Sequence, residues 1–150
     1  MANKVTWYNT DKTVVLQQYY GDYTKDDLYT VVKKSAEMLN SVSHTVHVII
    51  DERKVDKFMT ATDMRFLEKM VPPNQGAVVV IVPKTRIYYK EVIGNMGTKI
   101  APTAFTQAVM VFSYEEACQY LEKVHHVQCD GLPANGLPAD GLSADGLSAE

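Results

Sequence analysis

Residues 76–82 read Gly-Ala-Val-Val-Val-Ile-Val, a short continuous apolar run in the middle of the chain. Such a run is typical of a strand that is covered on both faces or nearly so, as in a parallel sheet. Residues 45–51, Thr-Val-His-Val-Ile-Ile-Asp, predict a second strand. Because helical patterns lie between and after these runs, the sequence indicates an α/β domain.

Capping residues mark where the helices begin. Thr60 and Asp63 form a capping pair, and Ser113 with Glu116 forms a capping box. Apolar residues follow at helical spacing, and Pro72 ends one of the segments. The helices are therefore expected at residues 24–42, 60–70, 87–100 and 114–124.

The remaining strands are predicted at the two ends of the domain. Residues 5–8 and 13–20 are rich in β-branched and aromatic side chains, and the turn residues 9–12 between them predict an antiparallel hairpin. Residues 107–112 predict the last strand. The expected order is β-β-α-β-α-β-α-β-α, which describes a mostly parallel five-stranded sheet with an N-terminal antiparallel hairpin, followed by a repetitive tail.

One face of this sheet is expected to be open. Short connections between parallel strands make each crossover right-handed. If the strands lie side by side in chain order, the crossover helices cover one face and leave the other without that cover. Alternation places His47 on the less buried side of its strand, and Trp7 is a further candidate for that side. We therefore expect Trp7 and His47 to form an interface.

The composition fits a single soluble domain. The chain has 150 residues, of which 46% are hydrophobic and 22% charged, enough for one core. No apolar run is long enough to span a bilayer, and the N-terminal sequence lacks the features of a secretory leader. We therefore expect a cytoplasmic protein with no transmembrane segment, in which Cys118 and Cys129 remain thiols.

The net charge of −3 comes from the C-terminal tail. The rest of the chain is nearly neutral, which argues against nucleic-acid binding. We expect residues 1–124 to form the domain and residues 125–150 to be a linker and a tail of four pentapeptides, such as Gly-Leu-Pro-Ala-Asp. The tail is interpreted either as a solubilising segment or as a set of weak docking segments.

The strand that ends with Val48-Ile49-Ile50-Asp51 stands before a capped helix, and a hairpin precedes it. In these features residues 3–124 resemble the STAS family, the anti-sigma-factor-antagonist fold that is also called SpoIIAA-like. Residues 7–12, 39–47 and 72–76 are more closely similar to uncharacterised bacterial SpoIIAA-like proteins. The resemblance implies a domain that acts through protein partners.

The resemblance also implies a phosphorylation switch. STAS regulators carry a Ser or Thr, modified by a partner kinase, at the start of the helix after the central strand, which corresponds to Thr60 and Thr62 here. Residues 58–63 read Phe-Met-Thr-Ala-Thr-Asp, without the Gly and the adjacent hydroxyls of the family's Asp-Ser-Ser-Gly loop. The alternative is that Thr60 only caps the helix.

The loops at the carboxyl edge of the predicted parallel strands are rich in basic and tyrosine residues. Helix N-termini converge at this edge, and α/β proteins bind ligands there. One interpretation is a site for an anionic or amphipathic ligand, and the other is a solvated rim of mixed charge, since acidic residues share these loops. The candidate rim residues are Lys25, Arg53, Lys54, Lys57, Lys84, Arg86, Lys90, Tyr88 and Tyr89.

Sequence motifs of catalysis are missing. The chain contains neither a P-loop nor a dinucleotide-binding glycine pattern, and it lacks the common nucleophile motifs, so we expect no catalytic residue and no cofactor. His125, His126 and Cys129 offer three metal donors without a fourth, so no metal site is expected. The leading hypothesis is a non-enzymatic STAS-like module that binds itself or another protein. The alternatives are a carrier or sensor of a small amphipathic or anionic ligand, and a structural subunit whose tail joins neighbours.

Overall fold

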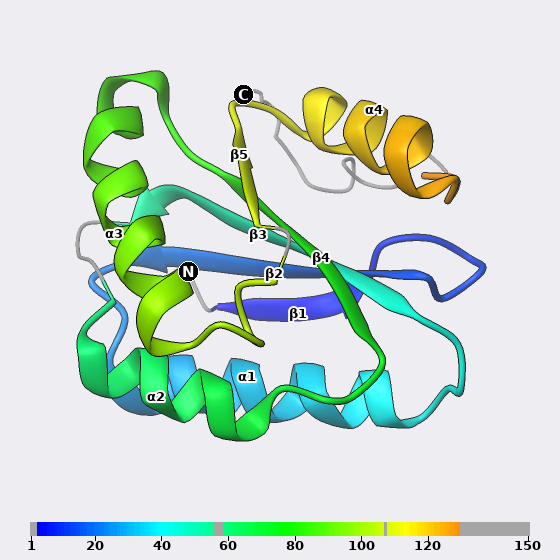
Figure 1. Ribbon diagram of the computed structural model, residues 1–150, viewed down its shortest axis with the longest axis horizontal. Helices are drawn as coiled ribbons and strands as arrows, with labels where there is room; N and C mark the ends of the chain where they lie inside the picture. The colour runs from blue at the N-terminus through cyan, green and yellow to red at the C-terminus, as the bar shows by residue number, and fades with distance from the viewer. Residues whose placement is uncertain (1–2, 56–58, 107, 130–150) are drawn as a thin grey trace.

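The computed structural model of the chain describes residues 3–55, 59–106 and 108–129 (Figure 1). The repeats of the tail and Lys57 lie outside the described residues. The strands are β1 (Lys4–Trp7), β2 (Val14–Gly21), β3 (Val46–Val55), β4 (Gln75–Ile81) and β5 (Val109–Val111). The helices are α1 (Lys25–Asn40), α2 (Ala61–Met70), α3 (Ile87–Ile100) and α4 (Tyr114–His125), with a short 3-10 turn, η1 (Lys84–Arg86), before α3.

The strands lie in one sheet in the order β1-β2-β3-β4-β5. β1 pairs with β2 in the antiparallel sense, and the other neighbours are parallel. Val48 of β3 lies between Val15 of β2 and Val78 of β4, so three β-branched residues meet across the centre of the sheet. The predicted α/β class, the hairpin and the mostly parallel five-stranded sheet are confirmed.

Capping bonds explain where the helices begin. At α2, Thr60 Oγ1 accepts a bond from the Asp63 backbone N–H, and Asp63 Oδ2 accepts one from the Thr60 N–H, each at 3.1 Å. At α4, Ser113 Oγ accepts from the Glu116 N–H at 3.1 Å. The Glu116 carboxylate accepts from the N–H of Phe112, one residue earlier than a capping box requires.

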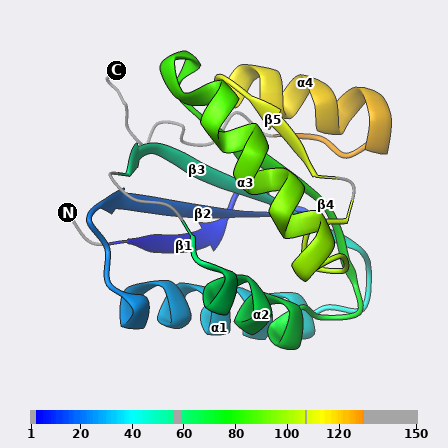
Figure 2. The ribbon, with the colours of Figure 1, turned by 60° about the vertical axis from the view of Figure 1, so that its left-hand side comes forward.

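The expectation of an open sheet face is wrong. α1 and α2 lie on one side of the sheet and α4 lies on the other (Figures 1 and 2). Ala117 and Leu121 of α4 are fully buried and pack into the same cluster as Leu16, Ile49 and Val79. The handedness rule fixes only helices that connect two parallel strands. Since no described strand follows α4, that helix is free to cover the opposite face.

The predicted interface of Trp7 and His47 is therefore wrong as well. His47 is 6% exposed and lies beneath α4, with its ring centroid 4.7 Å from that of His125. Trp7 points to the other face, where it packs with Val15 and Leu39 against α1. The two side chains lie on opposite faces and do not form one surface.

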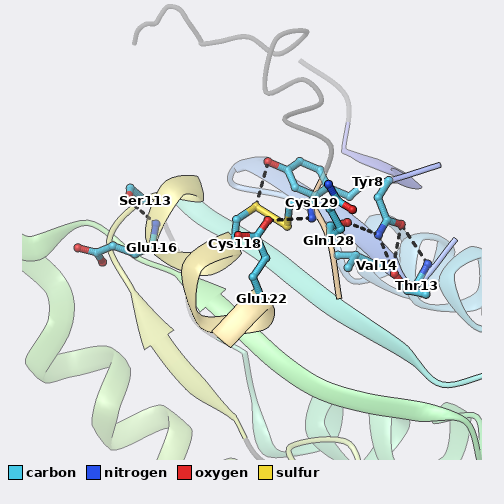
Figure 3. The surroundings of a disulfide bond; sticks show 10 residues. Tyr8, Thr13, Val14, Ser113, Glu116, Cys118, Glu122, Gln128 and Cys129 are labelled. Carbon is cyan, nitrogen blue, oxygen red and sulfur yellow. Dashed lines mark hydrogen bonds between the residues drawn. A yellow bond between two sulfur atoms is a disulfide. The ribbon is translucent and has the colours of Figure 1, made fainter. Parts of the chain in front are cut away.

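The chain after α4 returns to the domain and is fixed there. His126 caps the C-terminus of α4 in the left-handed conformation, with φ 59°. The expectation of two thiols is wrong, because Cys129 pairs with Cys118 in a disulfide, with 5.8 Å between the Cα atoms (Figure 3). The buried Asn9 donates from Nδ2 to the backbone oxygen of Gln128 at 2.8 Å. Residues 127–129, which we assigned to the linker, thus contact the hairpin turn.

We expect this disulfide to stabilise the folded chain. It closes a loop with a sequence separation of 11, for which chain-entropy arguments give about 3 kcal/mol. Urea unfolding monitored by circular dichroism checks this with and without a thiol reductant. The reduced protein should unfold at a lower urea concentration.

The control is the double variant Cys118→Ser and Cys129→Ser, whose unfolding should not respond to the reductant. Equal midpoints for the oxidised and reduced wild-type protein would contradict a stabilising role for this bond.

Candidate functional site

A cavity of about 50 Å³ lies between the sheet and the layer formed by α1 and α2. It has room for roughly three to five water molecules, because one water needs about 10–15 Å³ of such space. Much of its wall is apolar and comes from both helices and from the sheet face opposite α4. The apolar lining includes Leu28, Val32, Val48, Leu67, Met70, Val78 and Phe105.

A second part of the lining is polar and hydrogen-bonded. The Tyr19 hydroxyl donates to Gln17 Oε1 at 2.8 Å, and Gln17 Nε2 donates to Ser35 Oγ at 3.1 Å, so β2 and α1 are joined beside the cavity. Gln75 Nε2, at the start of β4, donates to the backbone oxygen of Ala104 at 3.1 Å. Glu52 of β3 also lines the cavity.

Two tyrosines line the cavity side by side. The ring centroids of Tyr19 and Tyr23 are 5.1 Å apart, and both side chains are buried. Burial raises the pKa of the Tyr19 hydroxyl, and the neighbouring Tyr23 and Glu52 raise it further. Burial likewise raises the pKa of Tyr23, with added effects from the carboxylates of Glu52 and Asp63. Both hydroxyls therefore stay protonated at neutral pH.

Asp63 is a buried carboxylate whose two oxygens differ. Oδ2 accepts the capping bond from the Thr60 N–H, whereas Oδ1 is buried and has no hydrogen-bond partner among the described residues. Thr60 thus has the capping role of the alternative interpretation. Thr62 is exposed on α2. Phosphorylation of either residue stays a prediction.

The candidate rim residues do not gather around this cavity. Arg53 forms an ion pair with Asp51, with 3.0 Å between Nη2 and Oδ2, and Arg86 donates from Nη1 to the Val55 oxygen at 2.7 Å. Lys54 lines a separate open hollow beside β2 and α1. Among the described side chains, none of the predicted rim residues lines the cavity.

The other rim residues have different surroundings. The ammonium groups of Lys25 and Lys84 lie over aromatic rings, those of Tyr29 and Phe112, at 5.9 and 5.6 Å from the centroids. Tyr88 is 80% exposed. The side chains of Tyr89 and Lys90, like Lys57, lie outside the described part.

Sequence reasoning missed a second polar cluster, which joins the sheet to α4. The Tyr114 hydroxyl donates to Asp51 Oδ2 at 2.7 Å, and Gln18 Nε2 donates to the Tyr114 oxygen at 3.3 Å. The guanidinium of Arg53 lies 5.0 Å from the centroid of the Tyr114 ring. Because Arg53 balances the charge of Asp51, this cluster is a structural link rather than a charged binding site.

His47 accepts a bond at Nδ1 from the Ala77 backbone N–H at 3.0 Å. Burial lowers its pKa to about 4, and the neighbouring His125 contributes to the shift. Within residues 3–55, 59–106 and 108–129, no group of three or more His, Cys, Asp and Glu side chains is placed to hold a metal ion.

Comparisons with known proteins add no assignment. No family model matches the chain, and no curated protein or solved structure gives a significant match. Of the helices in the described part, none has the length and apolar character needed to cross a bilayer. The chemistry of the cavity is therefore the basis for a functional proposal.

His47 should make the protein less stable as the pH falls. In the unfolded chain the pKa returns to about 6.5, so between about pH 6.5 and pH 4 the unfolded state binds a proton that the folded state does not. The full shift corresponds to about 3 kcal/mol. Urea unfolding at several pH values checks this, and His47→Gln should flatten the dependence.

The matched control is His44→Gln, which changes an exposed histidine. This variant should keep the slope of the wild-type protein. An equal slope for the wild-type protein and His47→Gln would contradict the assignment.

Proposed function

We propose that the protein is a non-enzymatic carrier or sensor that holds a small amphipathic molecule in the cavity between the sheet and the α1–α2 layer. The observation that carries the proposal is the composition of the cavity wall. Aliphatic and aromatic side chains make up most of it, and a few hydrogen-bonding groups from β2, β3 and β4 complete it. Such a combination is the usual character of small-molecule sites.

The lining favours binding over catalysis. Among the described lining residues, the titratable groups are Glu52, Tyr19 and Tyr23. The raised pKa values of the two tyrosine hydroxyls keep those hydroxyls protonated. No histidine, cysteine or lysine is among them. Gln17, which bridges Tyr19 and Ser35, is engaged on both sides of its amide and serves as structural support.

α2 is the wall that can yield when a molecule enters. Six residues of α1 are buried, whereas in α2 only Asp63 and Met64 are. Leu67 and Met70 line the cavity but are only partly buried. A helix with fewer buried contacts moves at a lower free-energy cost. The cavity volume in this structure is therefore a lower limit for the space that an occupant can fill.

A second candidate function is self-association as a STAS-like module, and an exposed stripe on α3 favours it. Tyr88, Val92 and Met96 follow each other at intervals of four residues and are 80%, 45% and 39% exposed. They lie on the helix that leads into β5, one of the two edge strands of the described sheet. A second copy that pairs along β5 would extend the sheet and cover apolar surface on α3.

Filling the cavity should weaken ligand binding without unfolding the chain. Ala36 lines the cavity from α1 and is 6% exposed, so Ala36→Val adds two methyl-sized groups there. We expect 1-butanol, titrated against protein with ¹³C-labelled methionine methyl groups, to shift the signals of Met59 and Met70. In the variant the affinity should fall by about tenfold, or about 1.4 kcal/mol.

The matched control is Lys33→Val, which introduces a valine on the exposed side of α1, away from the cavity. It should bind 1-butanol as the wild-type protein does. If 1-butanol leaves both methionine signals of the wild-type protein unchanged, the cavity is not a binding site.

Self-association has its own test. Val92→Lys should convert any dimer to a monomer in analytical ultracentrifugation, because it places a charge in the apolar stripe. Lys99→Ala, a change at the other end of α3, is the control. A wild-type protein that stays monomeric at high concentration would remove this candidate.

A further inference from the structure

We propose that the disulfide between Cys118 and Cys129 is a reversible redox clamp. The oxidised bond holds residues 127–129 against the hairpin turn, and reduction releases them while the rest of the domain stays folded. This inference concerns the α4 side of the sheet and does not depend on the cavity. Three features of the described residues carry it: the weak bonds that hold the segment, the separate attachment of α4, and the partial exposure of both cysteines.

Two of the hydrogen bonds that hold the segment are weak. The Val127 backbone N–H donates to the Leu121 oxygen at 3.4 Å, longer than the usual range of about 2.7–3.2 Å. The Cys129 N–H donates at 3.2 Å to Oε2 of Glu122, an exposed side chain for which water competes. Such bonds add little net free energy, and ordering three residues costs conformational entropy. The covalent bond therefore decides whether the segment stays in place.

Asn9 links the segment to the hairpin turn. Its buried Nδ2 donates to Thr13 Oγ1 at 2.7 Å and to the Gln128 backbone oxygen at 2.8 Å. Its Oδ1 accepts from the backbone N–H groups of Thr13 and Val14 at 3.0 and 3.2 Å. Only the bond to Gln128 leaves the hairpin, so the turn keeps its other bonds when the segment moves away. Water can then replace Gln128 at the Asn9 amide.

α4 is attached to the sheet by contacts that do not involve the disulfide. Ala117 and Leu121 are fully buried in the core beneath the helix. At the start of the helix, the Tyr114 hydroxyl donates to Asp51 Oδ2 at 2.7 Å. Burial of apolar side chains holds a helix in place without a covalent link. Breaking the disulfide should therefore release the chain after His126 and leave α4 on the sheet.

The disulfide lies where a small reductant can reach it. Cys118 and Cys129 are both half-buried, and the bond joins α4 to the returning chain (Figure 3). A thiolate of a dithiol attacks one sulfur to form a mixed disulfide, and its second thiolate then displaces the cysteine to which it is bound. The dithiol becomes a cyclic disulfide. The two electrons and two protons that it gives up leave both cysteines as thiols.

The position of Cys129 gives the clamp a consequence for the chain that follows. The first pentapeptide begins at Gly131, two residues after Cys129 in the sequence. In the oxidised protein, the last fixed point before the repeats is beside the hairpin turn. After reduction, the last fixed point is the end of α4. The redox state of the two cysteines thus sets where the repeats join the folded domain.

NMR relaxation of the full ¹⁵N-labelled chain tests the clamp, before and after dithiothreitol is added without denaturant. We expect the backbone order parameters of residues 127–129 to fall on reduction from about 0.85 to below about 0.6. The side-chain amide signals of Asn9 should shift, because the bond to Gln128 is lost. The order parameters of Leu121 in α4 and Ala77 in β4 should stay near about 0.85. Oxidised glutathione, which accepts the two electrons, should restore the first spectrum.

The matched control is the double variant Cys118→Ser and Cys129→Ser, which should resemble the reduced protein and respond to neither reagent. A segment that keeps its order after reduction would overturn the proposal. So would loss of the whole folded spectrum, since the bond would then be required for the fold, or a bond that dithiothreitol reduces only in denaturant. The reduced wild-type protein decides the question even if the double variant does not fold.

Discussion

The two central strands, β3 and β4, carry apolar side chains on both faces, and the rest of the molecule has to cover both. Val48 and Val78 face α1 and α2, whereas Ile49 and Val79 face α4. Because the strands lie in chain order, right-handed crossovers place their helices on a single face, so the cover for the other face must come from a segment that connects no parallel strands. α4 is that segment, and the disulfide fixes the residues that follow it (Figure 3). Asn9 bonds to Gln128 and Tyr114 bonds to Asp51, which hold α4 and the following residues against the sheet.

The cavity lies on the face of the sheet that α1 and α2 cover. On the α4 side, Leu16, Ile49 and Val79 meet small and branched side chains of one helix. On the side that faces α1 and α2, some of the side chains that point to the helices are polar, namely Gln17 and Tyr19 of β2 and Glu52 of β3. Polar groups cannot close-pack as aliphatic ones do without meeting their hydrogen-bond partners. Tyr19, Gln17 and Ser35 bond to one another beside the remaining space.

Local patterns predicted most of the fold. The apolar runs located β3 and β4, and Thr60 and Ser113 marked the starts of α2 and α4, because strand composition and capping act over a few residues. The side on which α4 packs could not be predicted, since no crossover constrains it. Cys118 and Cys129 pair only because the chain reverses at His126, and sequence separation alone does not indicate that reversal.

For the site, the prediction of a basic rim assigned Arg53 to a loop. Arg53 belongs to β3, where side-chain alternation places it on the same face as Asp51, its ion-pair partner two residues earlier. The cavity itself depends on packing between three elements, which no single segment encodes.

The two faces of the sheet thus have different physical character. On the α4 face, the charge of Asp51 is balanced by Arg53, its oxygens accept from Arg53 and Tyr114, and a covalent bond fixes the chain beyond the helix. On the α2 face, Asp63 has an oxygen without a partner in the described chain, and Glu52 stands in the wall of an incompletely filled space. A fully satisfied polar cluster gains little from a ligand, whereas an incompletely filled space gains the contacts that a ligand brings. This asymmetry, rather than the number of charged residues at the rim, favours the α1–α2 side of the sheet for the ligand site that we propose.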